Sequence, residues 1–99
     1  MTVTTKKENG VLTIELEGRL DTVTSQELSE KVPHEERNDL DIVLDFLKLE
    51  YISSAGLRLL IAFKKDAQAT NHKLVIRNCN DVIKEIFSVT GFDKFLTIE

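Results

Sequence analysis

Two adjacent serines, Ser53 and Ser54, are the residues of this sequence that point most directly to chemistry. They follow a predicted loop and begin a predicted helix, and the small residues Ala55 and Gly56 come next. The first turn of a helix has unsatisfied N–H groups and a partial positive charge, so it accommodates an anion. A phosphate on either hydroxyl would bring roughly −1.5 to −2 charges to that turn. Serine is also a common helix N-cap that needs no function, and this structural reading stays open.

Two apolar residues lie one turn beyond the serines. On a helical wheel Leu57 and Ile61 fall away from the predicted core arc, and their spacing of four makes them neighbours on the helix surface. We therefore expect them to be exposed and to form a docking patch, although single exposed apolar residues are common. Gly56 weakens a helix by about 1 kcal/mol relative to Ala, which indicates that another group comes close to it.

Residue patterns typical of enzymes are absent. The sequence has no phosphate-binding glycine motif, and its serines do not stand in a G-x-S-x-G pattern. His34 and His72 fall in predicted polar turns and are expected to be solvated. One Cys and two separated His supply no recognisable metal set, so we expect no metal and no cofactor. Asp45 ends a predicted strand, where a carboxylate is either functional or a hydrogen-bond acceptor for the next loop.

The composition describes a small acidic domain. The chain has 99 residues, 13 basic against 17 acidic side chains, and a formal net charge of −4. This length suits one domain over residues 1–99, and the acidic balance argues against nucleic acid as a partner. The longest apolar run, Leu59 to Phe63, is too short to cross a membrane, and the N-terminus lacks the apolar core of a signal peptide. The lone Cys79 fits a reducing compartment, so we expect a cytoplasmic protein without membrane insertion.

Strand signals and helix signals alternate along the chain, and the elements that they predict must position the two serines. Predicted strands run from Val3 to the Asn9-Gly10 turn, then over 11–17, 41–46, 73–77 and 92–98. Predicted helices run from Asp21 to about Val32, where Pro33 stops the helix, over 54–69, and from Asn78 or Asn80 to Gly91. The order β-β-α-β-α-β-α-β predicts an α/β fold, with a mixed sheet of four to five strands and helices mainly on one face.

Local signals add detail to these elements. Thr24 and Glu27 have capping-box spacing at the first helix, with Thr22 as the alternative cap. Gly18 is expected to end the second strand, residues 34–39 to form a polar loop and residues 47–53 to form a packed loop. The predicted core stripes are Leu59, Leu60, Phe63 and Ala67 in the middle helix, and Val82, Ile83, Ile86 and Phe87 in the last helix.

Four stretches of the sequence together resemble the STAS domain family, the anti-sigma factor antagonists of bacteria. They are Gly18–Asp21, Ile42–Phe46, Tyr51–Arg58 and Val89–Phe95, so the resemblance covers nearly the whole chain. It implies a regulated binding protein and not an enzyme. In this family the unphosphorylated protein binds an anti-sigma factor that is also an ATP-binding serine kinase, phosphorylation at the helix start releases it, and a phosphatase resets the cycle.

The resemblance also implies which residues carry this role. In many members the modified hydroxyl directly precedes the glycine, where this chain has Ala55. The Ser-Ser-Ala-Gly sequence looks like that of another branch, in which the second serine is the expected target. Ser54 is therefore the first choice and Ser53 the second. The implied partner-binding residues are Asp21, Ser53, Ser54, Ala55, Gly56, Leu57, Arg58 and Ile61.

Domains similar to this family also dock on transporters, including lipid-transport complexes, without being phosphorylated. A non-switching transporter subunit is therefore the alternative function. The missing hydroxyl at Ala55 favours it slightly, and the two retained serines oppose it. A monomer or a weak dimer is expected in either case.

Overall fold

A hairpin at Asn9 and Gly10 opens the fold, as predicted. Both residues have positive φ angles, 52° and 78°, which suit the tight turn between antiparallel strands. The turn joins β1 (Thr2–Glu8) to β2 (Val11–Leu20) in the computed structural model, which describes all 99 residues.

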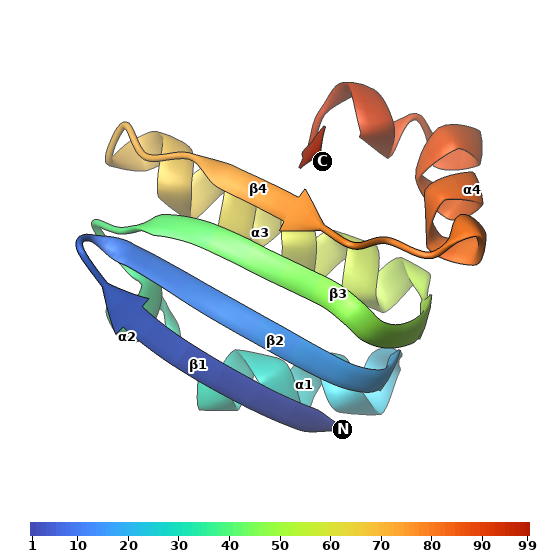
Figure 1. Cartoon of the computed structure of the whole chain (residues 1–99), viewed down its shortest axis with the longest axis horizontal. Helices are drawn as coiled ribbons and strands as arrows, with labels where there is room; N and C mark the ends of the chain where they lie inside the picture. The colour runs from blue at the N-terminus through green and yellow to red at the C-terminus, as the bar shows by residue number, and fades with distance from the viewer.

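Parallel strands continue the sheet beyond this hairpin (Figure 1). They are β3 (Asp41–Ile52), β4 (Leu74–Arg77) and β5 (Thr97–Ile98), and the spatial order is β1-β2-β3-β4-β5. Only the β1–β2 pair is antiparallel. The predicted α/β fold with a mixed sheet is therefore confirmed.

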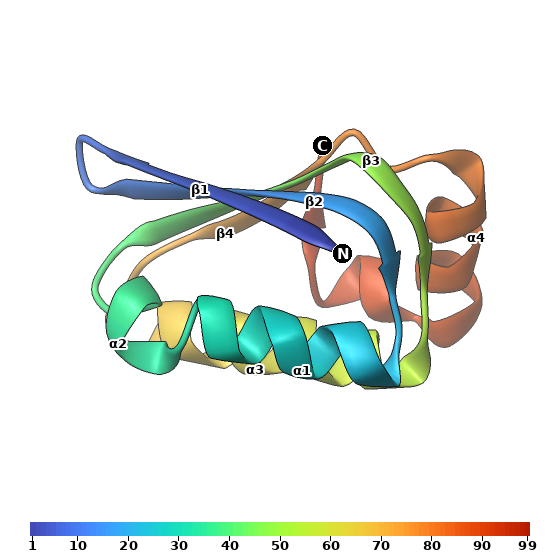
Figure 2. The same ribbon diagram turned by 90° about the horizontal axis from the view of Figure 1, so that it is seen from below.

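The helices cover one face of the sheet (Figure 2). α1 (Thr22–Lys31), α2 (His34–Arg37) and α3 (Ser54–Ala69) lie beneath the strands, and α4 (Asp81–Thr90) lies at the end where β3 and β4 finish. No helix is long and apolar enough to cross a membrane. The core forms where alternate strand residues meet the helices; it includes Leu12, Ile14, Leu16, Ile42, Leu44, Phe46, Leu60, Phe63 and Phe87.

Two strands are longer than predicted. β3 continues to Ile52, so the packed loop predicted over 47–53 is mostly strand, and β2 continues past Gly18 to Leu20. The alternation of apolar and polar residues fails in this part of β3 because two register shifts against β2 insert extra residues. These irregularities let Leu49 and Ile52 return to the core, and they bend β3 towards the start of α3.

Helix α2 occupies part of the stretch predicted as a polar loop, so that prediction is wrong for His34–Arg37. Arg37 is buried there, with Nε donating to Asp66 Oδ2 at 2.7 Å and Nη1 donating to the Val32 carbonyl at 2.6 Å. Its guanidinium lies 4.1 Å from the centre of the Phe63 ring. Asp66 and Phe63 are distant from Arg37 in sequence, so only tertiary packing brings them to it.

The residues that cap the helices agree only in part with those predicted from the sequence. Asp21 caps α1 and forms the capping box with Thr24, so neither Thr22 nor the Thr24–Glu27 pair does so. Asn80, one of the two predicted caps, begins α4, and Gly91 ends it with a φ of 78°.

The C-terminal part of the chain also departs from prediction. Val82 is 55% exposed and does not belong to the core stripe of α4. The strand predicted over 92–98 is reduced to β5, because a 3₁₀ turn, η1 (Phe92–Lys94), follows Gly91. The Leu96 N–H donates to the Phe92 carbonyl at 2.8 Å, so these groups are used within the turn and not in the sheet.

Candidate functional site

The two serines stand where β3 ends and α3 begins. Ser53 is the N-cap of α3, and its hydroxyl oxygen accepts a hydrogen bond of 3.3 Å from the Gly56 N–H. Its own N–H donates to the Leu20 carbonyl at 2.8 Å. Ser53 is half-buried, whereas Ser54 is exposed and its hydroxyl has no hydrogen-bond partner in the protein. Of the two hydroxyls, that of Ser54 is the more accessible.

Gly56 lies against the protein core. A Cβ atom at this position would lie 2.7 Å from Cγ1 of Ile52 and 2.9 Å from both Cγ and the carbonyl oxygen of Leu20. The close neighbour predicted for this glycine is therefore the end of strands β2 and β3. Glycine is needed here so that the first turn of α3 can pack directly on the sheet.

Asp21 begins α1 next to the start of α3. Leu20 and Ile52 are register partners at the ends of two parallel strands, so both following helices start at the same edge of the sheet. Hydrogen bonds from the backbone and side chain of Thr24 hold the pKa of Asp21 below its usual range. The carboxylate therefore stays charged and caps α1 while lying at the edge that carries Ser54.

Positive charge also lies at this edge. The N–H groups of Ser54 and Ala55 have no acceptor in the protein, as expected in the first turn of a helix. Arg58 is exposed and follows Ser54 by four residues, the spacing at which helix side chains are neighbours. The Arg19 guanidinium lies 4.6 Å from the centre of the Tyr51 ring. An anion on Ser54 would meet a helix N-terminus and an arginine.

The arrangement does not activate Ser54 as a nucleophile. Such a serine needs a general base within hydrogen-bond reach. The two histidines pair elsewhere, His34 with Asp66 at 3.3 Å and His72 with Asp39 and Asp41 at 3.0 Å each. The prediction that both are simply solvated misses these pairs. No group of three potential metal-binding side chains was found. No general base is therefore hydrogen-bonded to the Ser54 hydroxyl.

The predicted docking patch on α3 is wrong at Leu57, which is only 5% exposed, and Ile61 is half-buried. The helical wheel assumed that α3 packs against the sheet alone. In the structure α1 also lies against α3, so a second stripe of the helix is covered (Figure 2). The exposed apolar residue at this edge is Val23 in the first turn of α1, with 67% exposure. Its position on the helical wheel, far from Leu28 and Val32, could have indicated this.

Asp45 lies on the sheet face opposite the helices and has a structural role. Its Oδ1 accepts hydrogen bonds of 3.0 Å from the Leu47 N–H and from the Asn78 side chain. The sequence left two roles open for Asp45, a functional carboxylate or a hydrogen-bond acceptor for the next loop. In the structure Asp45 accepts a hydrogen bond from the backbone N–H of Leu47.

Comparisons with known proteins agree with this architecture. The family model described as "STAS domain" matches residues 2–99. The Bordetella bronchiseptica protein named "Putative anti-sigma factor antagonist BtrV" is 30% identical over 93 residues, covering 93% of this chain and 80% of the relative. The fold is similar to that of unphosphorylated SpoIIAA, an anti-sigma factor antagonist, with a TM-score of 0.83 and 16% identity over 99% of this chain and 88% of that chain. An anti-sigma factor antagonist from Mycobacterium paratuberculosis has a TM-score of 0.80 and 23% identity, covering 98% of this chain and 83% of that chain.

Proposed function

The chain belongs to the STAS domain family, and from that premise we propose that it is an anti-sigma factor antagonist. In this proposal the unphosphorylated protein binds an anti-sigma factor that is also an ATP-dependent serine kinase. Phosphorylation of Ser54 releases it, and a phosphoserine phosphatase restores the binding form. The outcome is control of sigma-factor-dependent transcription or of a related partner-switching pathway.

The observation that carries this proposal is the exposed hydroxyl of Ser54 in the first turn of α3. A kinase must reach the hydroxyl, and no group of the protein covers or engages it. Ser53 is the weaker candidate because it is half-buried and its oxygen already caps the helix. The relative named as an anti-sigma factor antagonist supports the same role.

Phosphorylation would change the surface without unfolding the domain. The phosphate would bring roughly −1.5 to −2 charges to a helix N-terminus that favours anions, with Arg58 one turn away. The adjacent Asp21 is also negative, so the edge would change from nearly balanced to strongly acidic. A partner that docks on this edge would then meet like-charge repulsion if its own surface is acidic there.

The proposed partner surface is the edge formed by the starts of α1 and α3. Its exposed members are Ser54 and Arg58, and Asp21, Ser53, Ala55 and Ile61 are partly accessible. Gly56 and Leu57 are buried, so they act by shaping this edge and not through exposed side chains. Val23 is added because it is the exposed apolar residue next to Asp21.

The test is phosphate transfer by candidate ATP-dependent serine kinases, taken first from any that are encoded beside this gene. Each kinase is incubated with ATP and the wild-type protein, Ser54→Ala or Ser53→Ala, and the product is read by intact mass and site mapping. We expect one phosphate on wild type and on Ser53→Ala, and none on Ser54→Ala. Ser88→Ala, which removes an exposed hydroxyl on α4, is the matched control and should be modified like wild type.

Binding to the same kinase completes the test. Phosphorylated protein should bind at least about tenfold more weakly than unphosphorylated protein, as expected for unfavourable charge placed in an interface. Modification of Ser54→Ala at Ser53 would overturn the site assignment. Binding that is independent of phosphate would overturn the switch and favour the non-switching transporter subunit.

A further inference from the structure

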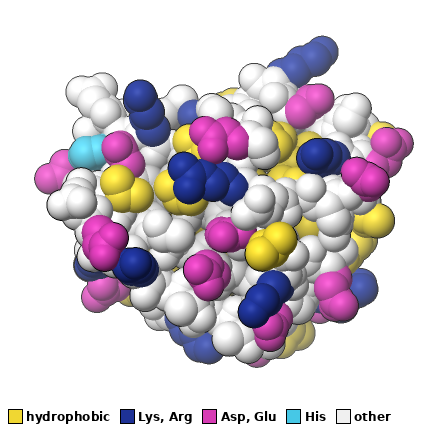
Figure 3. Space-filling model, viewed as in Figure 1, with side chains coloured by type: hydrophobic (Ala, Val, Ile, Leu, Met, Phe, Trp, Pro, Cys, Tyr) yellow, Lys and Arg dark blue, Asp and Glu magenta, His cyan; other side chains and the backbone are white.

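One face of the sheet has no helix over it. The side chains that alternate with the core residues point to this face and are mostly polar. Figure 3 views it directly and shows acidic and basic side chains with hydrophobic ones scattered among them. The face includes Thr13, Glu15 and Glu17 of β2, Val43, Asp45 and Leu47 of β3, and Val75 and Arg77 of β4.

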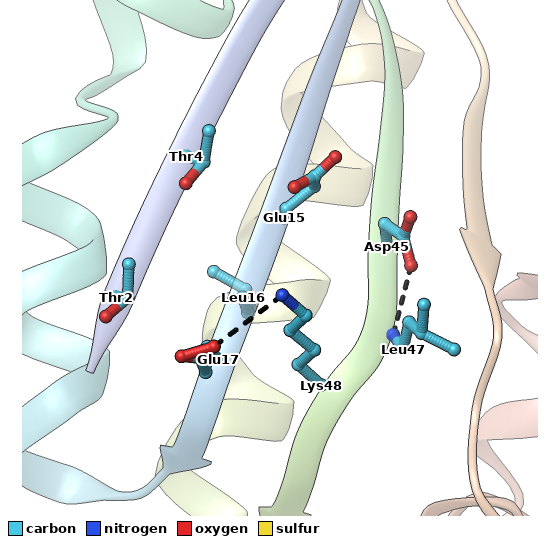
Figure 4. A pocket seen from close by; sticks show the side chains of 8 residues that line it. All are labelled: Thr2, Thr4, Glu15, Leu16, Glu17, Asp45, Leu47 and Lys48. Carbon is cyan, nitrogen blue, oxygen red and sulfur yellow. Dashed lines mark hydrogen bonds and ion pairs between the residues drawn. The ribbon is translucent and has the colours of Figure 1, made fainter.

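A hollow of about 370 Å³ lies on this face over β1, β2 and β3 (Figure 4). Thr2 and Thr4 of β1 line one side. Glu15 and Asp45 stand on the neighbouring strands β2 and β3, and Leu47 lies further along β3. Glu17 and Lys48 also line the hollow, so it combines hydroxyls, three carboxylates, one ammonium and two leucines, Leu16 and Leu47. It lies on a face away from the helix that carries Ser54.

Leu47 is exposed because of a bulge in β3. Glu15 pairs with Asp45 but Glu17 pairs with Lys48, so β3 has one residue more than β2 between these pairs. As a result both Leu47 and Lys48 are exposed, with 69% exposure for Leu47. Bulges commonly re-aim side chains beside functional sites. Here the bulge exposes an aliphatic side chain next to Asp45 on β3.

The charge of this hollow is not balanced within the chain. Glu15 and Asp45 are register partners on strands about 4.8 Å apart, and like charges placed opposite each other are unfavourable. Lys48, the one basic residue that lines the hollow, has its Nζ 3.9 Å from Glu17 Oε2, so three carboxylates stand against one ammonium. Arg77 is the register partner of Asp45 on β4, but its Nε donates to Glu99 at 3.0 Å. Neither Glu15 nor Asp45 has an ion-pair partner, and the hydrogen bonds that Leu47 and Asn78 donate to Asp45 Oδ1 leave Asp45 Oδ2 without a partner.

We propose that this hollow is a docking site for a segment of a partner protein that presents an arginine beside an apolar side chain. The planar guanidinium donates to two carboxylates at once, which matches Glu15 and Asp45 on adjacent strands. The apolar neighbour packs on Leu47, which the bulge exposes. The Lys ammonium lacks this fork geometry and is the poorer match. The site does not depend on Ser54, so it stands or falls separately from the phosphorylation switch.

The probe is the dipeptide N-acetyl-leucyl-arginine amide, titrated into the ¹⁵N-labelled full chain. We expect saturable amide shifts confined to the strands around Thr4, Glu15, Asp45 and Leu47. The citrulline analogue has the same shape without the charge, and N-acetyl-leucyl-glutamate amide reverses it. Both should give weaker, non-saturating shifts.

Variants connect the shifts to the proposed contacts. Glu15→Gln and Leu47→Ala should each weaken binding about twofold to fivefold, the range of an exposed charge pair or a small apolar contact. Glu30→Gln on α1, which removes an exposed carboxylate elsewhere, should bind like wild type. Absence of saturable shifts up to the solubility of the peptide, equal binding of the citrulline analogue, or shifts centred on Ser54 would each overturn the proposal.

Discussion

The backbone N–H of Ser53 donates a 2.8 Å hydrogen bond to the carbonyl oxygen of Leu20, which joins the start of α3 to the end of β2. The next residue along from Leu20 is Asp21, the N-cap of α1. This bond extends the parallel pairing of β2 and β3 to the starts of both helices. The exposed hydroxyl of Ser54 and the charged carboxylate of Asp21 therefore lie at one edge of the sheet.

Gly56→Ala is expected to destabilise the protein although alanine favours helices. Intrinsic propensity alone would stabilise the helix by about 1 kcal/mol. The added methyl would lie 2.9 Å from the Leu20 carbonyl, and that backbone cannot move without disturbing the Ser53 hydrogen bond. We expect a loss of about 1–3 kcal/mol in urea unfolding. A stabilised variant would contradict the close packing, so the sign alone decides.

Ser53→Ala and Ser54→Ala should separate the structural serine from the functional one. Ser53→Ala removes the N-cap acceptor of the Gly56 N–H and should lower the free energy of unfolding by about 1 kcal/mol. Ser54→Ala removes an exposed hydroxyl without a partner and should change it by less than about 0.5 kcal/mol. Urea unfolding of both variants checks this, and equal losses would mean that the two serines share the capping role.

Arg37→Ala is expected to be among the most damaging single changes. It removes the partner of Asp66, a donor to the Val32 carbonyl, and the packing on the Phe63 ring. The expected loss is about 3 kcal/mol, as for breaking a buried pair.

The Arg37–Asp66 pair also allows a double-mutant cycle. Burial alone would raise the pKa of Asp66, but hydrogen bonds from Arg37 and His34 outweigh it and hold that pKa below its usual value. Arg37→Ala combined with Asp66→Ala should therefore cost less than the sum of the two single changes. Strict additivity in urea unfolding would show that the pair does not interact.

His72 should make stability depend on pH near neutrality. Hydrogen bonds with Asp39 and then Asp41 raise the pKa of His72 above 6.5. A raised pKa means that the folded state binds the proton more tightly than the unfolded state. The contribution is therefore full below about pH 6.5 and is lost as pH rises through the folded pKa.

NMR titration and unfolding curves test this assignment. The His72 ring should titrate above pH 6.5 in the wild type and closer to 6.5 in Asp39→Asn. The decline in the free energy of unfolding as pH rises above about 6.5 should be smaller in His72→Gln than in the wild type. A His72 ring that titrates below 6.5 would contradict the two hydrogen bonds.

The local sequence determined the elements and their order. Asn9-Gly10 and Gly91 act through local backbone preferences, and Asn80 acts through its side chain, which accepts from the Ile83 N–H. These effects need no residue from a distant segment. The limits of α3 and the buried alternation in β2 followed from periodicity, because a residue pattern reports which side of an element is apolar. In β3 the run Asp41–Phe46 reads as nearly continuously apolar, and the structure buries only alternate residues there. That two serines stand at a helix start was predicted from the neighbouring loop and helix signals, and the choice of Ser54 came from the family resemblance.

The tertiary structure decided which faces of each helix and strand are covered by other elements. The exposure of Leu57 was mispredicted because α1 packs on α3, and a helical wheel holds no information about a second helix. The extension of β3 to Ile52 depends on register shifts against β2, which are a property of the pair of strands and not of either alone. Arg37 is buried through a partner 29 residues away, and Gly56 is required by the ends of two strands. These are contacts between segments distant in sequence, so they exist only once the sheet and helices have assembled.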